Sequence, residues 1–231
     1  MRIGGYQKLT LIDYPGKLAA TIFTVGCSFR CPFCHNPELV LGKNVSGGKI
    51  LEDEFFKFLK NRRGKLEGVC ITGGEPTIQK DLIEFIQKIK KLGFKIKLDT
   101  NGTRPDVLKK LLDLKILDFV AMDIKNQLKK YDRTTGVKGD KERIKLSVGL
   151  IMNSRLPYEF RTTVVPGLHT TKDFPVIAKW IKGAKSYYLQ EYREQVILDP
   201  KLKQKTKGKK IDLDKIKQKI EKNFKQMGIR K

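Results

Sequence analysis

Three of the four cysteines in the chain lie within eight residues, at Cys27, Cys31 and Cys34. Structural zinc sites close a tetrahedron with four cysteine or histidine ligands, usually as two separated pairs. The sequence offers no second pair, because Cys70 stands alone and histidine occurs only twice. Three thiolates on one short loop suit a [4Fe–4S] cluster in which one iron has no protein ligand. Such an iron can bind a substrate or cofactor, as the open position of a catalytic metal does.

Six apolar runs typical of strands are each followed by a helical or loop segment. The runs are rich in Val, Ile, Thr, Phe and Tyr, and they cover 19–26, 68–74, 95–102, 118–125, 158–167 and 186–192. Amphipathic helical patterns cover 51–63, 79–93, 104–115, 141–153 and 172–183. On the first of these patterns, Leu51, Phe55, Phe58 and Leu59 share one face. Six such units predict a parallel sheet with right-handed crossovers, either open and doubly wound or a barrel-like (βα)6 arc.

Polar or glycine residues stand where five of these runs end. They are Cys27, then Gly73-Gly74-Glu75, Asp99-Thr100-Asn101, the pair Asp123 and Lys125, and Pro166-Gly167. The carboxyl ends of parallel strands meet at one edge of a sheet or one end of a barrel, where ligands bind. The sequence therefore predicts a single active site there.

The last 30 residues give weaker signals. The segment 201–210 contains no acidic residue, and we expect a mobile linker or basic loop. The segment 211–228 predicts a terminal helix docked on the barrel, with an apolar face formed by Leu213, Ile216, Ile220, Phe224 and Met227. We expect one domain over 1–231, with a core at about 17–195.

The cysteine spacing C-x3-C-x2-C, with Phe33 before the third cysteine, resembles the signature of the radical S-adenosylmethionine (SAM) superfamily. The segments Asp13-Tyr14-Pro15-Gly16 and Cys34-His35-Asn36-Pro37 resemble the proteins that activate glycyl-radical enzymes. Among these, the sequence looks most like activating proteins of anaerobic ribonucleoside-triphosphate reductases and is similar to pyruvate formate-lyase activases. The resemblance covers nearly the whole chain, with GGEP, DTNG, MDIK and VVPG in family order.

The resemblance implies a partial (βα)6 TIM-like barrel of the radical SAM type, with outer helices. It would hold one [4Fe–4S] cluster on Cys27, Cys31 and Cys34, together with one SAM. SAM would chelate the open iron through its amino and carboxylate groups, and an electron from the reduced cluster would cleave a sulfonium C–S bond. The 5′-deoxyadenosyl radical would then take a hydrogen atom from a glycine of a partner enzyme. The protein supplies positioning and electrostatics for this chemistry.

The resemblance also implies SAM contacts at the strand ends. The segment Gly73-Gly74-Glu75-Pro76 matches the motif that holds the SAM amino group, which a carboxylate attracts. Taken alone, this segment could be an ordinary strand-to-helix turn. Phe33 and the backbone beside His35 are expected to border the adenine. The other expected contacts are Thr100, Asn101, Asp123, Ile124, Lys125 and Arg161.

A monovalent-cation site at Asp99, Thr100 and Asp123 is a further implication of the resemblance, since hard oxygen ligands suit such an ion. The alternative is that these groups cap helices and satisfy one another. The sixth run carries Tyr192-Arg193 where pyruvate formate-lyase activases have a Tyr-His pair, which favours the reductase-activating branch. We expect Cys70 to be a small buried apolar side chain and His169 to be a loop residue.

Composition limits the possible compartment and partners. Hydrophobic residues make up 39% of the 231 residues, which fits a globular core rather than disorder. The sequence shows neither a run of about 20 apolar residues nor a secretory signal pattern, so we expect no membrane association and a cytoplasmic location with reduced thiols. The net charge of +24 leaves three explanations open: nucleic-acid binding, an acidic protein partner, or solvated lysine-rich helix faces.

Three functions compete. The leading hypothesis is an oxidoreductase that installs a glycyl radical on a partner enzyme, expected to be an anaerobic ribonucleotide reductase, with a flavodoxin or ferredoxin as electron donor. The alternative is a radical SAM enzyme that modifies a nucleotide or tRNA; the charge favours it, but a basic patch interleaved with aromatic residues is missing. The third is an electron carrier without enzymatic activity, which the missing fourth ligand and the GGEP and MDIK segments argue against.

Overall fold

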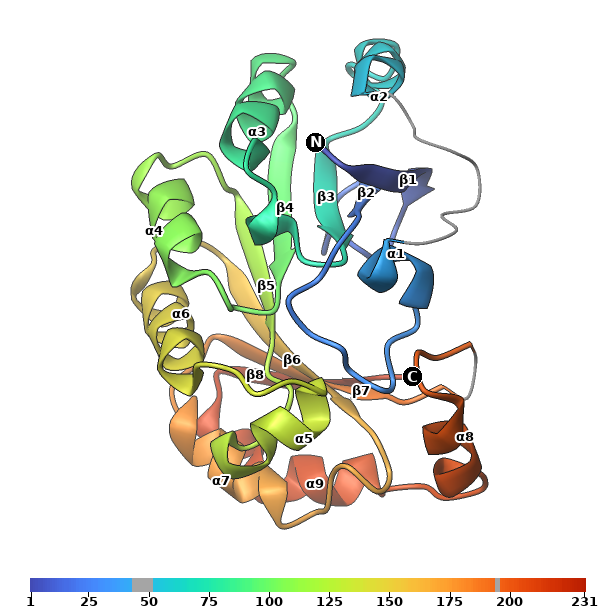
Figure 1. Ribbon diagram of the computed structural model, residues 1–231. Helices are drawn as coiled ribbons and strands as arrows, with labels where there is room; N and C mark the ends of the chain where they lie inside the picture. Colours follow the sequence, from blue (N-terminus) through green and yellow to red (C-terminus); the bar gives the residue numbers. More distant parts are fainter. Residues whose placement is uncertain (43–51, 194–195) are drawn as a thin grey trace.

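A computed structural model describes residues 1–42, 52–193 and 196–231. Its described residues form one curved sheet in which the spatial order of the strands is their order in the chain (Figure 1). The strands are β1 Ile3–Thr10, β2 Ala19–Thr24, β3 Gly68–Gly73, β4 Lys95–Thr100, β5 Phe119–Asp123, β6 Tyr158–Val164, β7 Ser186–Glu191 and β8 Gln226–Arg230. Strands β2 to β8 run parallel, and β1 pairs with β2 in the antiparallel direction.

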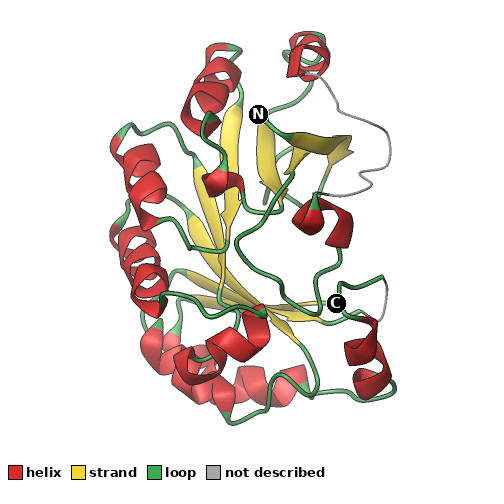
Figure 2. Cartoon of the chain, viewed as in Figure 1, coloured by secondary structure: helices red, strands yellow, loops and turns green. Residues whose placement is uncertain are grey.

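The described helices are α1 Pro37–Leu41, α2 Glu52–Lys60, α3 Leu82–Lys91, α4 Pro105–Asp113, α5 Tyr131–Thr135, α6 Lys141–Asn153, α7 Asp173–Trp180, α8 Pro200–Thr206 and α9 Leu213–Ile220. Most of them lie along the outside of the curved sheet, whereas α1 and α8 lie by its open side (Figure 1 and Figure 2). Short 3-10 turns occupy Pro76–Ile78, Leu128–Lys130 and Glu221–Asn223. Parallel strands with crossover helices on one face confirm the predicted partial α/β barrel. None of the described helices has the length and apolar character needed to cross a membrane.

The core lies between the sheet and the outer helices. Leu82, Phe85, Ile86 and Ile89 of α3 lie on its inner face and are at most 1% exposed. Burying one such side chain contributes about 1.5–3 kcal/mol, so this stripe alone is enough to fix α3 against the sheet. In α2, Phe55 and Leu59 are buried as predicted and Phe58 is partly buried, whereas Leu51 lies outside the described residues.

Two strands, β1 and β8, were not predicted from the sequence. Strand β1 is an edge strand in which only Ile3 and Thr10 are buried, so its sequence carries no apolar run. The predicted helix over 211–228 is wrong beyond Ile220, because the chain turns there and continues as β8 beside β7. Leu213, Ile216 and Ile220 do form the buried face of α9. Met227 has the spacing of that face but belongs to the strand.

The expected basic loop at 201–210 is also wrong in its first part, because α8 covers Pro200–Thr206. Pro200 stands at the start of the helix, and the side chain of Asp199 accepts a hydrogen bond from the backbone N–H of Lys201. Leu202 and Thr206, one turn apart, are the buried positions. The two positions are four apart in the sequence, which is the spacing of one helical face, and the residues around them are mostly lysines.

Strand β8 is fastened to the sheet by a buried ion pair. Glu159 of β6 is 2% exposed and accepts two hydrogen bonds from the guanidinium of Arg230, at 2.8 and 2.7 Å. The same guanidinium lies 3.9 Å from the ring centroid of Tyr188 on β7. Arg230 therefore ties the last strand to two earlier ones.

Replacing Arg230 with Met tests this pair. Loss of the guanidinium leaves the buried Glu159 carboxylate without hydrogen bonds from a cation, with only the Arg161 guanidinium 3.9 Å away, and we expect the free energy of unfolding to fall by about 3 kcal/mol. Urea unfolding of the purified protein measures this loss. The control is Arg104→Met, whose ion pair with Asp106 is more exposed and for which we expect a change below about 1 kcal/mol. Equal losses in the two variants would contradict a stabilising role for the buried pair.

Candidate active site

One cavity of about 210 Å³ lies at the carboxyl ends of β2 to β6. It brings together nearly all the site residues predicted from the sequence: Cys27, Cys31, Phe33, Cys34, His35, Gly73, Gly74, Glu75, Asp99, Thr100, Asn101, Asp123, Lys125 and Arg161. Pro76 and Ile124 are buried and do not belong to its lining. The Ile124 side chain packs in the hydrophobic core instead. Four of the five predicted strand-end segments therefore meet at one site, whereas Pro166-Gly167 does not line the cavity and β6 contributes Arg161 and Thr163 instead.

The three clustered thiols share this cavity. Burial raises the pKa of Cys27 to about 11 and that of Cys31 to about 12, and it also raises the pKa of Cys34. Negative charge on a neighbouring cysteine raises the pKa of Cys27 and Cys31 further. Binding iron must therefore displace protons from these thiols. Cys70 is 0% exposed and lies outside the cavity lining.

The thiols fit a cluster better than a single ion. Among the described residues, no three His, Cys, Asp or Glu side chains are close enough together to hold one metal ion. The cysteines of a [4Fe–4S] cluster each bind a different iron, so their sulfurs lie farther apart than the ligands of one ion. Three thiolates around one cavity are the donor set that such a cluster takes, with one iron left open.

The backbone of the cysteine loop is held by its own arginine. The Arg30 guanidinium donates to the carbonyl oxygens of Cys27 and Phe29, at 2.7 and 2.8 Å. The backbone N–H of Arg30 donates to the carbonyl of Thr135 at the end of α5. The N–H of Phe29 points at Cys27 Sγ, at 3.4 Å. Arg30 thus shapes the loop, and a backbone amide faces one of the thiols.

The loop is also joined to the end of β3 through two glycines. The N–H of Glu75 donates to the carbonyl of Gly26, and the N–H of Gly74 donates to Thr24. A Cβ atom at Gly74 would lie 1.9 Å from the Gly26 oxygen, so only glycine fits at this contact. Gly73 has a φ of +108°, which glycine adopts without strain.

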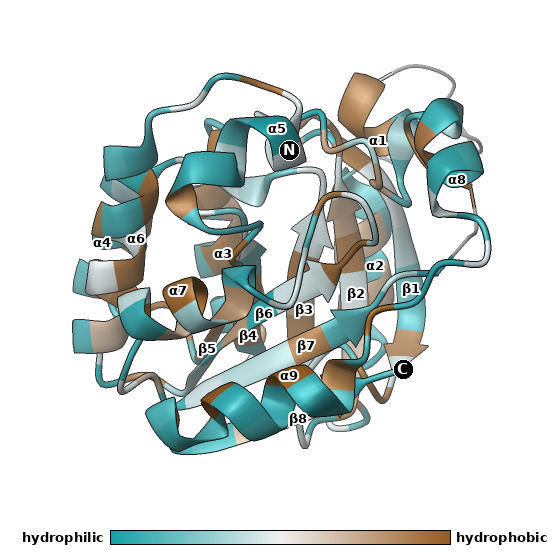
Figure 3. Ribbon diagram, turned by 90° about the horizontal axis from the view of Figure 1, so that it is seen from below, coloured by the Kyte–Doolittle hydropathy of each residue, from teal (hydrophilic) through white to brown (hydrophobic). Residues whose placement is uncertain are grey.

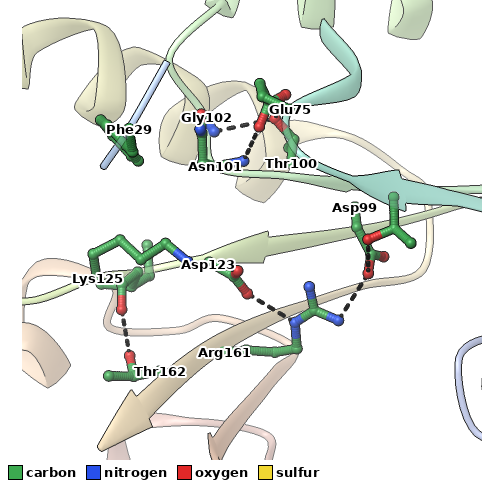
Figure 4. A network of polar contacts seen from close by, with 12 residues as sticks. Phe29, Glu75, Asp99, Thr100, Asn101, Gly102, Asp123, Lys125, Arg161 and Thr162 are labelled. Carbon is green, nitrogen blue, oxygen red and sulfur yellow. Dashed lines mark hydrogen bonds and ion pairs between the residues drawn. The ribbon is translucent and has the colours of Figure 1, made fainter. Parts of the chain in front are cut away.

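Glu75 is fully buried and surrounded by hydrogen-bond donors. Its Oε1 accepts from both the N–H and the hydroxyl of Thr77 and from the hydroxyl of Thr100, and its Oε2 accepts from the N–H of Asn101. Figure 4 shows Glu75 beside Thr100 and Asn101. Burial raises the pKa of Glu75, although these hydrogen bonds oppose the rise. With a single donor on Oε2, the carboxylate can still accept from an ammonium group.

Asn101 connects Glu75 to the cysteine loop. While its N–H bonds Glu75, its side-chain Nδ2 donates to the hydroxyl of Ser28 at 3.0 Å and approaches Cys27 Sγ at 3.7 Å. The DTNG and GGEP segments and the cysteine loop therefore form one polar network.

Positive and negative side chains from the ends of β4, β5 and β6 lie side by side in the lining of the cavity. The Arg161 guanidinium lies between two carboxylates, with Nη1 3.1 Å from Asp99 and Nε 3.0 Å from Asp123 (Figure 4). Lys125 Nζ lies 2.8 Å from Asp123, and the buried Lys97 pairs with Asp99. Burial raises the pKa of both carboxyls, but the neighbouring cations outweigh it and hold each pKa below its usual range.

These pairs bear on the expected monovalent-cation site. Asp99 and Asp123 already face protein cations, and the Thr100 hydroxyl donates to Glu75. The geometry of these three residues matches the alternative, in which neighbouring protein groups meet their charges and hydrogen bonds. The cation stays a prediction from the resemblance.

Lys125 is held from both sides of its backbone. Its N–H donates to the Tyr131 hydroxyl at 3.3 Å, and its carbonyl accepts from Nε2 of His169 at 2.8 Å. His169 is 2% exposed, and its Nδ1 accepts a hydrogen bond from the N–H of Val165. This loop histidine therefore links the backbones of Val165 and Lys125, a contact that was not predicted from the sequence. Burial lowers the pKa of Lys125, but the charges of Asp123 and Cys31 outweigh it and the pKa is raised.

Lys97 was not predicted as a site residue, and the contact of Tyr192 with His35 was not predicted either. Lys97 is 1% exposed, and its Nζ lies 3.7 Å from Cys70 Sγ, so Cys70 is buried as predicted but has polar neighbours. The alternation of Lys97 and Asp99 in β4, two residues apart and thus on one face, was the available signal. The Tyr192 ring stacks on His35 at a centroid distance of 6.0 Å, beside the cysteine loop.

Residues 21–181 match the sequence profile of the radical SAM superfamily. The chain belongs to that superfamily. Over 218 residues it is 34% identical to a Methanocaldococcus jannaschii protein with the provisional name glycyl-radical enzyme activating enzyme, covering 91% of this chain and 88% of that protein. It is also 34% identical over 133 residues to a pyruvate formate-lyase-activating enzyme of Listeria monocytogenes, covering 54% of this chain and 53% of that enzyme. The radical SAM family implies a [4Fe–4S] cluster and SAM.

A solved structure agrees on the fold. Streptococcus suis SuiB bound to S-adenosylmethionine superposes with a TM-score of 0.63 over 90% of this chain and 49% of SuiB, at 15% sequence identity. The barrel of this radical SAM protein is therefore that of its structural relatives, while the activating-enzyme likeness rests on sequence.

The assignment of the cluster ligands predicts the iron content of cysteine variants. Cys27→Ala, Cys31→Ala and Cys34→Ala are each expected to lose the cluster, because two thiolates cannot hold it in this loop. Cys70→Ala is the matched control and should keep about four irons per chain, because Cys70 lies outside the cavity. Iron assay and absorption after anaerobic reconstitution measure the difference. Full iron retention in any of the first three variants would refute the assignment.

The environment of Glu75 predicts the effect of Glu75→Gln on SAM affinity. The substitution removes the negative charge that would attract the SAM ammonium and turns an amide NH2 toward existing donors. We expect the dissociation constant for SAM to rise about tenfold or more, which corresponds to at least about 1.4 kcal/mol. Equilibrium binding to the reconstituted protein measures it, with Glu142→Gln on the exposed face of α6 as control. Unchanged affinity at full iron content would remove Glu75 from the SAM site.

Proposed function

We propose that this radical SAM protein reductively cleaves SAM to a 5′-deoxyadenosyl radical and generates a glycyl radical on an anaerobic ribonucleotide reductase. The observation that carries the proposal is the single cavity in which three cysteines, without a fourth, face Glu75 and the charged residues Lys125 and Arg161. The 34% identity to a protein named as a glycyl-radical enzyme activating enzyme supports the reaction class.

The cavity offers both signs of charge to a ligand that carries both. The methionine end of SAM has an ammonium and a carboxylate. Oε2 of Glu75 suits the ammonium, and Lys125, whose Nζ lies 5.8 Å above the Phe33 ring centroid, suits a carboxylate. Phe33 and His35 provide flat apolar faces for the adenine. The cluster would supply the electron, and these side chains would bind and orient SAM.

The choice of partner rests on sequence. The chain carries Tyr192-Arg193 in place of a Tyr-His pair, which favours the reductase-activating branch over the pyruvate formate-lyase branch. A flavodoxin or ferredoxin is the proposed electron donor. The monovalent cation and the cytoplasmic location stay predictions.

The test is electron paramagnetic resonance of the partner. The reduced, reconstituted protein is incubated with SAM and an anaerobic ribonucleotide reductase, and we expect a doublet from the radical on the partner. The doublet arises from the remaining α-hydrogen, so it should collapse to a singlet when the partner contains α-deuterated glycine. The Cys34→Ala variant is the control and should give no signal.

Three outcomes would overturn the proposal in different ways. A doublet on pyruvate formate-lyase alone would change the partner but keep the reaction. SAM cleavage that leaves both enzymes free of radical and modifies a nucleotide or tRNA would favour the alternative function, which the net charge of +24 supports. Failure to cleave SAM would contradict both.

A further inference from the structure

Helix α8 is attached directly to the cysteine loop. The backbone N–H of Leu198 donates to the carbonyl of Cys34 at 3.0 Å, and the N–H of Asp199 donates to the carbonyl of Pro32 at 2.9 Å. The helix begins one residue later, at Pro200. The segment that leads into α8 therefore lies along the cysteine loop and connects a surface helix to the backbone of Pro32 and Cys34 through two hydrogen bonds.

The exposed side of α8 is strongly basic. Residues 200–210 contain no acidic residue, and most of the α8 ribbon has the colour of hydrophilic residues (Figure 3). Burial of Leu202 and Thr206 fixes the orientation of the helix, so that the lysines point to solvent. We define the lysine surface by its exposed members: Lys201, Lys203, Lys205, Lys207, Lys209 and Lys210.

This surface differs from the other lysine-rich helices of the barrel. Elsewhere lysines alternate with acids and form ion pairs, as Lys109 does with Asp113 in α4 and Lys145 with Glu142 in α6. Such interleaved faces are typical of solvated helices and have little net field. A run of lysines without acids produces a positive potential that attracts an acidic protein over a distance.

We propose that the lysine surface is the docking site of an acidic one-electron carrier protein that reduces the cluster. The inference rests on the proposed function, in which each SAM cleavage requires one electron from outside the chain. One electron passes from the reduced carrier to the oxidised cluster, so the carrier is oxidised and the cluster reduced, and no covalent bond forms or breaks.

The position of α8 favours a carrier over the protein substrate. The described lining of the 210 Å³ cavity includes no residue from 197–210. A substrate glycine must reach that cavity, whereas an electron needs only proximity to the cluster. A partner seated on α8 approaches the cluster from the side of Pro32 and Cys34 and leaves the cavity open to the substrate.

The test compares two variants with the same change in charge. In the first, Lys201, Lys203, Lys205 and Lys207 are each replaced with Gln, which keeps Leu202 and Thr206. In the matched control, Lys215, Lys219, Lys222 and Lys225, which are exposed lysines in and after α9, are replaced with Gln. Reduced flavodoxin is the acidic carrier used, and each reconstituted protein is measured at low and high salt.

Two readouts are independent of catalysis. They are the dissociation constant of the carrier complex and the second-order rate of cluster reduction, followed by the loss of iron–sulfur absorption. For the α8 variant at low salt we expect at least about a tenfold weaker complex and a slower reduction, with a flatter salt dependence. The α9 variant should stay within about threefold of the wild type. Both variants should be reduced normally by dithionite, which needs no docking.

Equal affinities and equal reduction rates in the two variants would overturn the proposal. Normal carrier binding by the α8 variant, combined with weaker binding of the glycyl-radical enzyme or of RNA, would assign the surface to that other partner and also overturn it. If the wild type were reduced by dithionite but did not cleave SAM, the proposed function would fail. The carrier binding and reduction rates would still decide the docking site.

Discussion

The contact between the carbonyl of Gly26 and the backbone of Gly74 and Glu75 joins the two halves of the site. This carbonyl, at the start of the cysteine loop, accepts a hydrogen bond from the N–H of Glu75 in the turn after β3, and the N–H of Gly74 donates to the carbonyl of Thr24 at the end of β2. This approach is possible because Gly74 has no Cβ, which would lie 1.9 Å from the Gly26 oxygen. Through it, the loop that carries the three thiols and the carboxylate suited to a SAM ammonium are held in one geometry. Asn101 adds a second link, since it bonds Glu75 and approaches Cys27.

Charge inside the barrel is organised as pairs rather than as isolated groups. Arg161, Lys97 and Lys125 together compensate Asp99 and Asp123 at the cavity, and Arg230 pairs with Glu159 deeper in the sheet. Removing one member of such a pair leaves a charge without compensation in a place with little water. The pairs at the cavity lower the pKa of Asp99 and Asp123 and hold the side chains in place, so that the cavity keeps a fixed pattern of charge for a ligand that carries both signs.

Six strands were predictable because most residues of β2 to β6 are buried and form apolar runs, while β7 alternates buried and more exposed residues. Strand β1 lies at the edge with little burial, Met227 of β8 continues the helical spacing of the apolar face of α9, and α8 has only Leu202 and Thr206 to mark it among lysines. The strand ends likewise revealed where the site lies. The partners of its charges did not follow from the sequence, because the contacts of Arg161 and of His169 join residues 38 to 62 positions apart. Such contacts depend on how the sheet curves.

The central claim is that three cysteines hold a cluster whose fourth iron is open to SAM. The most direct measurement is electron–nuclear double resonance of the reduced, reconstituted protein mixed with SAM whose amino group carries 15N. The account predicts a 15N coupling to the cluster that is present with SAM and absent without it. A cluster that shows no such coupling at saturating SAM would contradict the account, because its fourth iron would then not be the site where SAM binds.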